Sequence, residues 1–128
     1  MAYQKTICID FDGTIVDHEF PWIGKLKPGV REALQLFRAL GYRILISSCR
    51  TSNWHKEEFG HVDEGPAMQR PIVKDMIEAL NKADIPYDVV DDGSKGKPFA
   101  DLYIDDKGLR FQDNWAQIAA WVAASEER

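Results

Sequence analysis

The sequence predicts an α/β fold of the Rossmann-like kind, a three-layer sandwich built on a central, mainly parallel sheet. Two observations carry this prediction: short apolar runs of strand character alternate with amphipathic helical stretches, and polar residues follow directly after three of the runs. Alternating strands and helices imply right-handed crossovers and parallel strands whose carboxyl ends meet at one edge. With 128 residues and 45% apolar content, the chain is expected to form a single domain over residues 1–128.

The first three elements follow from apolar patterning. Residues 6–9 form a β-rich run that closes on an acidic residue. From Pro28 onward apolar residues recur at helical spacing, with a proline suited to the first turn and Gly41 suited to a C-terminal cap. Residues 42–46 then predict a second buried strand that stops at the polar run 47–50.

The second half of the chain repeats this alternation. Residues 51–66 have no period and are predicted to be a functional or mobile loop. A second amphipathic helix is expected to begin near Pro71, because an interior proline would break it. It is followed by a strand at 87–90, a turn-rich loop at 91–98, a fourth strand at 102–104 and a last helix from Trp115. This last helix is expected to pack back on the sheet.

Charge and composition exclude several classes of protein. The 21 acidic and 16 basic residues give a formal charge of −5 without a basic patch, so a long nucleic-acid partner is not expected. No secretion signal is visible, and no apolar stretch approaches the roughly 20 residues that cross a membrane. The two cysteines, Cys8 and Cys49, allow no disulfide framework and fit a reducing compartment. We therefore expect a cytoplasmic protein.

The chemistry is expected where strands end. Asp10, Ser48 and Asp105 each follow an apolar strand, and Asp12 and Gly13 lie just beyond the first. Gly13 permits a tight turn that exposes neighbouring amides to an anion. Carboxylates gathered at two strand ends repel one another unless a divalent cation lies between them, and oxygen ligands of this kind suit Mg²⁺.

Four segments carry a resemblance to a known superfamily. Residues 7–14, which read ICIDFDGT, resemble the first motif of the haloacid dehalogenase superfamily. The other motifs follow in order: ILISS resembles the second, Gly96-Lys97-Pro98 the third, and LYIDD the paired-acid form of the fourth. Within the superfamily, most of the chain is similar to small phosphatases of the capsular-polysaccharide-biosynthesis type.

The resemblance implies a role for each motif residue. Asp10 would attack phosphorus and form an aspartyl phosphate, and Asp12 would protonate the leaving oxygen and later activate water. Ser48 and Lys97 would contact the phosphoryl oxygens, joined by the amides of Phe11 and Asp12. Mg²⁺ would be held by Asp10, the Asp12 main-chain carbonyl and Asp105, with Asp106 ligating directly or through water.

Alternatives remain open at several positions. Ser47 competes with Ser48, and Lys95 competes with Lys97. Arg50 either grips a second anionic group of the substrate or belongs to a structural ion pair. The three histidines, His18, His55 and His61, have no close ligand spacing, so they are expected at the surface or at the rim of the substrate site, and no zinc is predicted.

The chain is also too short at both usual insertion points for a cap domain, since 13 residues separate Thr14 from Pro28. The expected activity is hydrolysis of a small phosphate monoester such as a sugar phosphate. The alternatives are a phosphatase acting on a macromolecular end and a non-catalytic binding protein of the same fold. Because a capless enzyme must cover its site in another way, a homo-oligomer with contacts through Trp22 or Trp54 is also expected.

Overall fold

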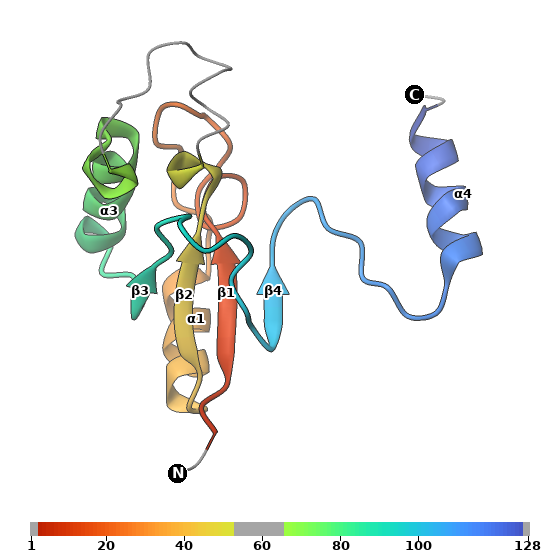
Figure 1. Ribbon diagram of the computed structural model, residues 1–128, viewed down its shortest axis with the longest axis horizontal. Coiled ribbons are helices and arrows are strands. Elements are labelled where there is room, and N and C mark those ends of the chain that lie inside the picture. The colour runs from red at the N-terminus through yellow and green to blue at the C-terminus, as the bar shows by residue number, and fades with distance from the viewer. Residues whose placement is uncertain (1–2, 53–65, 127–128) are drawn as a thin grey trace.

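The computed structural model describes residues 3–52 and 66–126 and has a four-stranded, all-parallel sheet (Figure 1). The strands are β1 (Thr6–Asp10), β2 (Arg43–Ser47), β3 (Val89–Val90) and β4 (Leu102–Ile104). They lie in the order β3-β2-β1-β4, so β1 is central and β4 is an edge strand. The predicted α/β, Rossmann-like class is confirmed, and the described residues contain no separate cap domain.

The helices agree with the apolar patterning. They are α1 (Val30–Ala39), α3 (Pro71–Lys82) and α4 (Trp115–Glu126), with short 3-10 helices η1 (Cys49–Thr51) and η2 (Ala67–Gln69). Pro71 is the first residue of α3, as predicted. Gly41 ends α1 with a φ of 90°, a left-handed conformation that glycine adopts without strain. Helix α1 begins two residues after Pro28, with Gly29 as its N-cap.

The core lies between the sheet and two helices. Register pairs Ile7 with Ile44 and Ile9 with Ile46, which places these four side chains on one sheet face. They join one buried cluster with Leu34 of α1 and with Val73, Met76 and Leu80 of α3. Helices α1 and α3 therefore cover the same face, as consecutive right-handed crossovers in one direction require.

The segment between β3 and β4 crosses the opposite face, as Figure 1 shows. Tyr103 points to this side, because it is out of phase with Leu102 and Ile104. Its hydroxyl donates to the carbonyl of Pro98 and accepts from the amide of Ala100 at 3.1 Å. A loop anchored on Tyr103 thus lies where the sequence pattern predicted a packed layer.

The prediction that the last helix packs back on the sheet is wrong for this structure. Helix α4 stands away from the body at the end of an extended segment, residues 105–114 (Figure 1). It contacts no other helix or strand in the described part of the chain. The expectation failed because α4 is apolar on every side, so its sequence does not indicate which face meets a partner. No described helix is long and apolar enough to span a membrane.

Candidate active site at the carboxyl ends of the strands

The strand ends bring three of the motif segments together. Asp10 is the last residue of the central strand and pairs with Ser47 of β2. On its other side Ile9 pairs with Ile104, so Asp105 and Asp106 follow directly at the neighbouring strand end. The first, second and fourth motif segments therefore meet at one edge of the sheet, where parallel sheets bind their ligands.

The environment of Asp10 disfavours its charged form. The side chain is half-buried, and this desolvation raises its pKa from the ordinary 3.8 to about 6. A hydrogen bond from the Phe11 amide opposes the shift, while the negative charges of Asp106, Asp12 and Asp105 add to it in that order. Burial and the neighbouring acids therefore both disfavour the ionised form of Asp10.

Asp12 forms a buried, two-pronged ion pair with Arg50. The Arg50 Nε donates to Asp12 Oδ2 at 2.9 Å, and Nη2 donates to Oδ1 at 2.8 Å. Arg50 is fully buried, and Asp12 is 6% exposed. Of the two alternatives stated for Arg50, the structure has the ion pair, and the guanidinium is not accessible to a substrate.

The same guanidinium binds three backbone carbonyls. Its Nη1 donates to Ile72 at 2.9 Å and to Pro21 at 3.2 Å, and its Nη2 donates to Trp22 at 3.0 Å. The rings of Phe11 and Phe20 lie 5.6 and 5.0 Å from its central carbon. Arg50 therefore joins the Asp12 carboxylate to two other segments, the loop after β1 and the start of α3.

The loop after β1 is a short hairpin over residues 15–27. Asp17 donates from its amide to the carbonyl of Lys25 at 2.8 Å, and Lys27 donates to Ile15 at 2.9 Å. A side chain at Gly24 would collide with the Asp17 carbonyl, so the turn needs glycine there. This hairpin takes up the whole of the chain between Thr14 and Pro28.

Gly13 makes room for Asp106. A Cβ on Gly13 would lie 2.4 Å from Asp106 Oδ2, so only glycine lets this carboxylate approach the loop after β1. Gly13 has a φ of 87°, and its amide donates to the Val16 carbonyl at 2.8 Å. That amide is used within the loop, where Gly13 shapes the turn, and a part for Gly13 in substrate binding stays a prediction.

Asp105 has a different environment from its neighbour. Its Oδ1 accepts hydrogen bonds from the amides of Gly108 and Lys107, which lower its pKa in that order. Asp106 instead lies near the Lys107 ammonium at 3.5 Å and is the strongest charged neighbour of Asp10. Of the predicted pair, Asp106 therefore has the closer electrostatic link to Asp10.

Both candidate serines lie at the site with distinct surroundings. Ser48 is buried, and its Oγ accepts from the Arg50 amide at 3.0 Å as the N-cap of η1. Its own hydroxyl proton is left to donate. Ser47 is level with Asp10 in the sheet, and its side chain opposes the rise that burial causes in the pKa of the Cys8 thiol. The structure keeps both residues as candidates.

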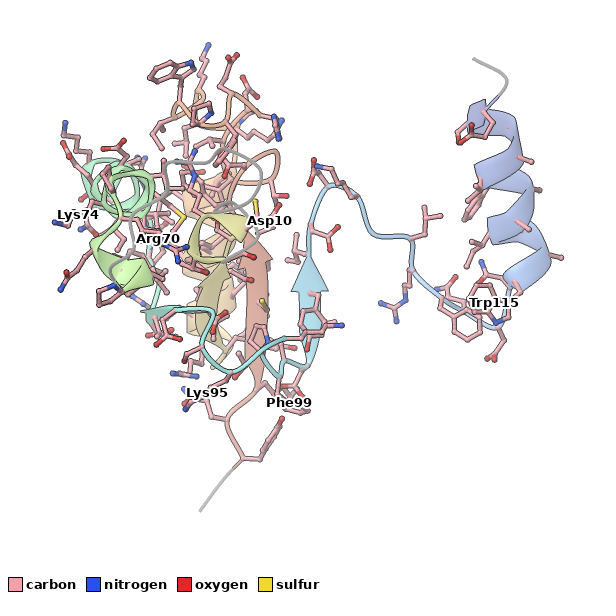
Figure 2. All side chains as sticks on the ribbon, turned by 45° about the horizontal axis from the view of Figure 1, so that its top comes forward. Asp10, Arg70, Lys74, Lys95, Phe99 and Trp115 are labelled. Atoms are coloured by element: carbon pink, nitrogen blue, oxygen red, sulfur yellow. The ribbon has the colours of Figure 1, made fainter. Side chains whose placement is uncertain are left out.

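Lys97 is not in contact with the Asp10 carboxylate in this structure. Its ammonium lies 4.4 Å from the centre of the Tyr103 ring, on the sheet face toward which Asp10 also points. Lys95 lies away from Asp10, as Figure 2 shows.

The donor set fits Mg²⁺. In the described residues no three acidic, histidine or cysteine side chains already form a site that could hold a metal ion. However, burial and, after it, the negative charges of neighbouring acids raise the pKa of Asp10, and a divalent cation would relieve both effects. The Asp10, Asp105 and Asp106 carboxylates and the Asp12 main-chain carbonyl would be the oxygen ligands of such an ion, whereas the Asp12 carboxylate pairs with Arg50.

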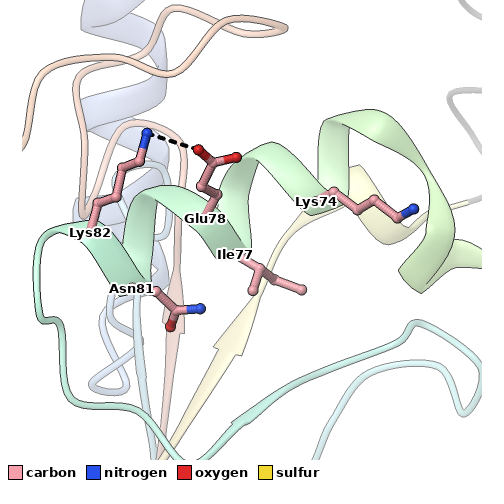
Figure 3. A pocket seen from close by; sticks show the side chains of 5 residues that line it. All are labelled: Lys74, Ile77, Glu78, Asn81 and Lys82. Atoms are coloured by element: carbon pink, nitrogen blue, oxygen red, sulfur yellow. Dashed lines mark ion pairs between the residues drawn. The ribbon is translucent and has the colours of Figure 1, made fainter.

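Several residues that the sequence analysis named lie away from the strand ends or outside the described residues. Trp22 is 74% exposed and His18 is exposed on the same hairpin. Trp54, His55 and His61 lie outside the described residues. A surface hollow of about 480 Å³ lies along α3, lined by Lys74, Ile77, Glu78, Asn81 and Lys82 (Figure 3). It contains none of the site residues.

One buried charge was not predicted from the sequence. Arg70, just before α3, is 2% exposed, and its Nη1 donates to the carbonyl of Ser52 at 3.0 Å. It also donates to the Arg50 carbonyl at 3.4 Å, so it supports the segment that carries Arg50. No sequence signal distinguishes this arginine from a surface residue.

The chain is similar to two solved bacterial structures. A conserved protein from Bacteroides thetaiotaomicron has a TM-score of 0.59 at 26% identity, over 96% of this chain and 93% of that one. A crystallised target protein from Vibrio cholerae has a TM-score of 0.50 at 27% identity, over 84% of each chain. No protein-family model and no curated protein matches the sequence. The likeness supports the fold and names no activity.

Proposed function

We propose that this protein is a Mg²⁺-dependent phosphate monoester hydrolase of the haloacid dehalogenase type, with Asp10 as its nucleophile. The observation that carries the proposal is the position of Asp10 at the end of the central strand, with Asp12 and Asp106 as its charged neighbours. Such a perturbed carboxylate among acidic neighbours is typical of a functional site rather than of a turn cap. The order of the four motif segments supports the same reading.

The reaction has two steps. An Asp10 carboxylate oxygen attacks phosphorus, the bond from phosphorus to the leaving oxygen breaks, and protonated Asp12 gives its proton to that oxygen. Water then attacks the phosphorus of the aspartyl phosphate and gives a proton to Asp12. The bond between phosphorus and the Asp10 oxygen breaks, so phosphate is released and the Asp10 carboxylate is restored. Mg²⁺, when bound, supplies positive charge against the nucleophile and the phosphoryl oxygens.

Arg50 fits a role in orienting this acid. By pairing with both oxygens of Asp12, it holds the carboxylate in one orientation. Each carboxylate oxygen keeps a second lone pair for a ligand. Arg50 therefore acts as a positioning residue that fixes the direction of the Asp12 carboxylate.

A small phosphorylated metabolite such as a sugar phosphate is the proposed substrate. The basis is the resemblance to capsular-polysaccharide-type phosphatases, together with a negative net charge that disfavours long nucleic acids. The described residues carry no cap domain over the site, so phosphorylated oligonucleotides and phosphopeptides serve as comparison substrates.

The test is phosphate release with Mg²⁺ from p-nitrophenyl phosphate and from a panel of sugar phosphates. The wild-type protein should release phosphate, and Asp10→Asn should not, because an amide cannot attack phosphorus. Asp17→Asn, an exposed acid on the hairpin, is the matched control and should keep wild-type turnover. No release by the wild type, or equal release by Asp10→Asn, would reject the proposal.

A further inference from the structure

Helix α4 has no partner within the described chain. None of its twelve residues is buried, and it contacts no other described helix or strand. Figure 2 shows Trp115, at its start, far from the sheet. All hydrogen bonds and ion pairs of residues 107–126 in the described structure are made with partners in residues 105–126.

An uncovered helix of this composition is unstable in water. Isolated helices shorter than about 12–15 residues are marginal, and a helix that is apolar on all sides is normally a buried one. Trp115 is 72% exposed, and Trp121 and Val122 are about half exposed. Leu109 and Phe111 extend this apolar surface along the connecting segment. A surface of this kind marks an interaction site.

The body of the same chain has an open apolar groove. It lies between α1 and the β4 side of the sheet, has a volume of about 280 Å³, and is lined by Ile15, Val30, Ala33, Phe37 and Ile104 among others. Leu102 and Ile104 continue the apolar face of Ile7 and Ile9 but remain 41% and 36% exposed. The helical cover that α1 and α3 give to the other strands stops short of β4.

Groove and helix are complementary in chemistry. Among the described residues, Lys27 is the one charged residue that lines the groove, and it pairs with Asp17 at 3.1 Å. Glu126 is the one charged residue in α4, so each apolar surface carries a single charge of opposite sign. Within the described residues, helix α4 is apolar and contacts no other helix or strand, and the groove is apolar and has no helix over it.

The length and direction of the connecting segment bear on whether α4 covers the groove of its own chain or that of a second copy. Residues 105–114 leave the end of β4 and carry α4 away from the groove of their own chain (Figure 1). These ten residues exceed the 2–6 that usually join a strand to its own covering helix, and when extended they span about 33 Å. Exchange of identical elements is a low-cost route to a closed two-fold dimer.

We propose that two copies exchange their C-terminal segments, with α4 of each copy seated in the groove between α1 and β4 of the other. The exchange covers both apolar surfaces reciprocally and leaves neither unpaired. The proposal is independent of the phosphatase assignment, because it rests on residues outside the proposed catalytic set.

Cysteine cross-linking distinguishes exchange from self-docking. In a Cys49→Ser background, which leaves only the buried native Cys8, Ala33→Cys is combined with Ala116→Cys, Ala120→Cys or Ala123→Cys and treated with a short bismaleimide. Exchange predicts a linked dimer in at least one combination, and each single variant alone should stay unlinked. A link within one chain, or no link in any combination, would overturn the proposal. Lys82→Cys replaces Ala33→Cys as the control on α3 and should not link.

Mass measurement gives a second, independent test. Light scattering of the wild-type chain should give twice the 14.6 kDa monomer mass. Trp121→Glu should shift the protein to the monomer, and it should still fold because α4 contacts no other element in its own chain. Gln117→Glu adds the same charge at a polar position of α4 and should leave the dimer intact. A monomeric wild type, or a dimer that survives Trp121→Glu, contradicts the exchange.

Discussion

Replacement of Arg50 by alanine should severely destabilise the protein. The substitution leaves the Asp12 carboxylate, 6% exposed, without its two-pronged partner, and it also leaves the carbonyls of Pro21, Trp22 and Ile72 without this donor. Removal of one partner of a buried ion pair costs about 3–5 kcal/mol, because an uncompensated charge remains inside. For a domain of this size that cost corresponds to a fall of roughly 10–20 °C in Tm.

The assay is thermal and urea unfolding followed by circular dichroism, at matched pH and without metal. Arg38→Ala is the control, since Arg38 pairs with Asp88 at 3.2 Å but both side chains are more than one-third exposed. Exposed pairs contribute about 0–1 kcal/mol, so this variant should stay close to wild type. Arg50→Lys keeps the charge but cannot form the two-pronged contact, and it should fall between the two.

A double variant separates the ion pair from lost packing. Asp12→Asn removes the negative charge, so Arg50→Ala should cost less in that background than in the wild type. The reasoning is refuted if Arg50→Ala alone costs less than about 1 kcal/mol, or if its cost is unchanged when Asp12 is neutral. If Arg50→Ala does not fold, the same comparison is made with Arg50→Lys.

The other predictions concern the acidic residues and their surroundings. Without metal, Asp10→Asn should have a higher Tm than wild type above pH 6. The pKa of Asp10 is higher in the folded than in the unfolded state, so the wild type loses stability as pH rises from about 4 through 6, whereas the amide does not titrate. Melting temperatures of the two proteins that converge at neutral pH would contradict this. Asp12→Asn should lower kcat by about 10²–10⁴-fold with Mg²⁺ affinity retained, and a wild-type rate would point to another acid. Mg²⁺ should raise the wild-type Tm and raise it less in Asp106→Asn, as measured by thermal melts; equal shifts would remove Asp106 from the metal site. Gly13→Ala should displace the Asp106 carboxylate and cost about 1–3 kcal/mol, and unchanged unfolding and turnover would show that this contact is unimportant.

The strands and the first two long helices were predictable because their signals are local. A buried strand that ends on Asp10, or a helix that begins at Pro71, is specified by neighbouring residues and by steric rules. The strand boundaries shifted by one residue at β2, and β3 shrank to Val89–Val90, because backbone pairing sets strand ends more strictly than hydrophobicity does.

The contacts of the site were less predictable because they join distant segments. The Asp12–Arg50 pair spans 38 positions, and a single arginine in a polar run looks the same in sequence whether it is buried or solvated. Lys97 was placed by its motif, but its position over Tyr103 depends on the path of an exposed loop. The position of α4 was unpredictable for the reason already given, since a helix without a polar face has no preferred orientation in its sequence.

Arg50 also has a consequence for local opening of the fold. The guanidinium holds the hairpin over residues 15–27, the acid Asp12 and the first turn of α3 at one point. The hairpin cannot open independently, because opening breaks the hydrogen bonds from Arg50 to the carbonyls of Pro21 and Trp22. It also removes part of the packing around the Asp12–Arg50 ion pair. In hydrogen exchange, the Asp17 and Trp22 amides, which are bonded within the hairpin, should therefore open in the same cooperative unit as the turn at Arg50. Opening of the hairpin would therefore also change the surroundings of the Asp12 carboxylate.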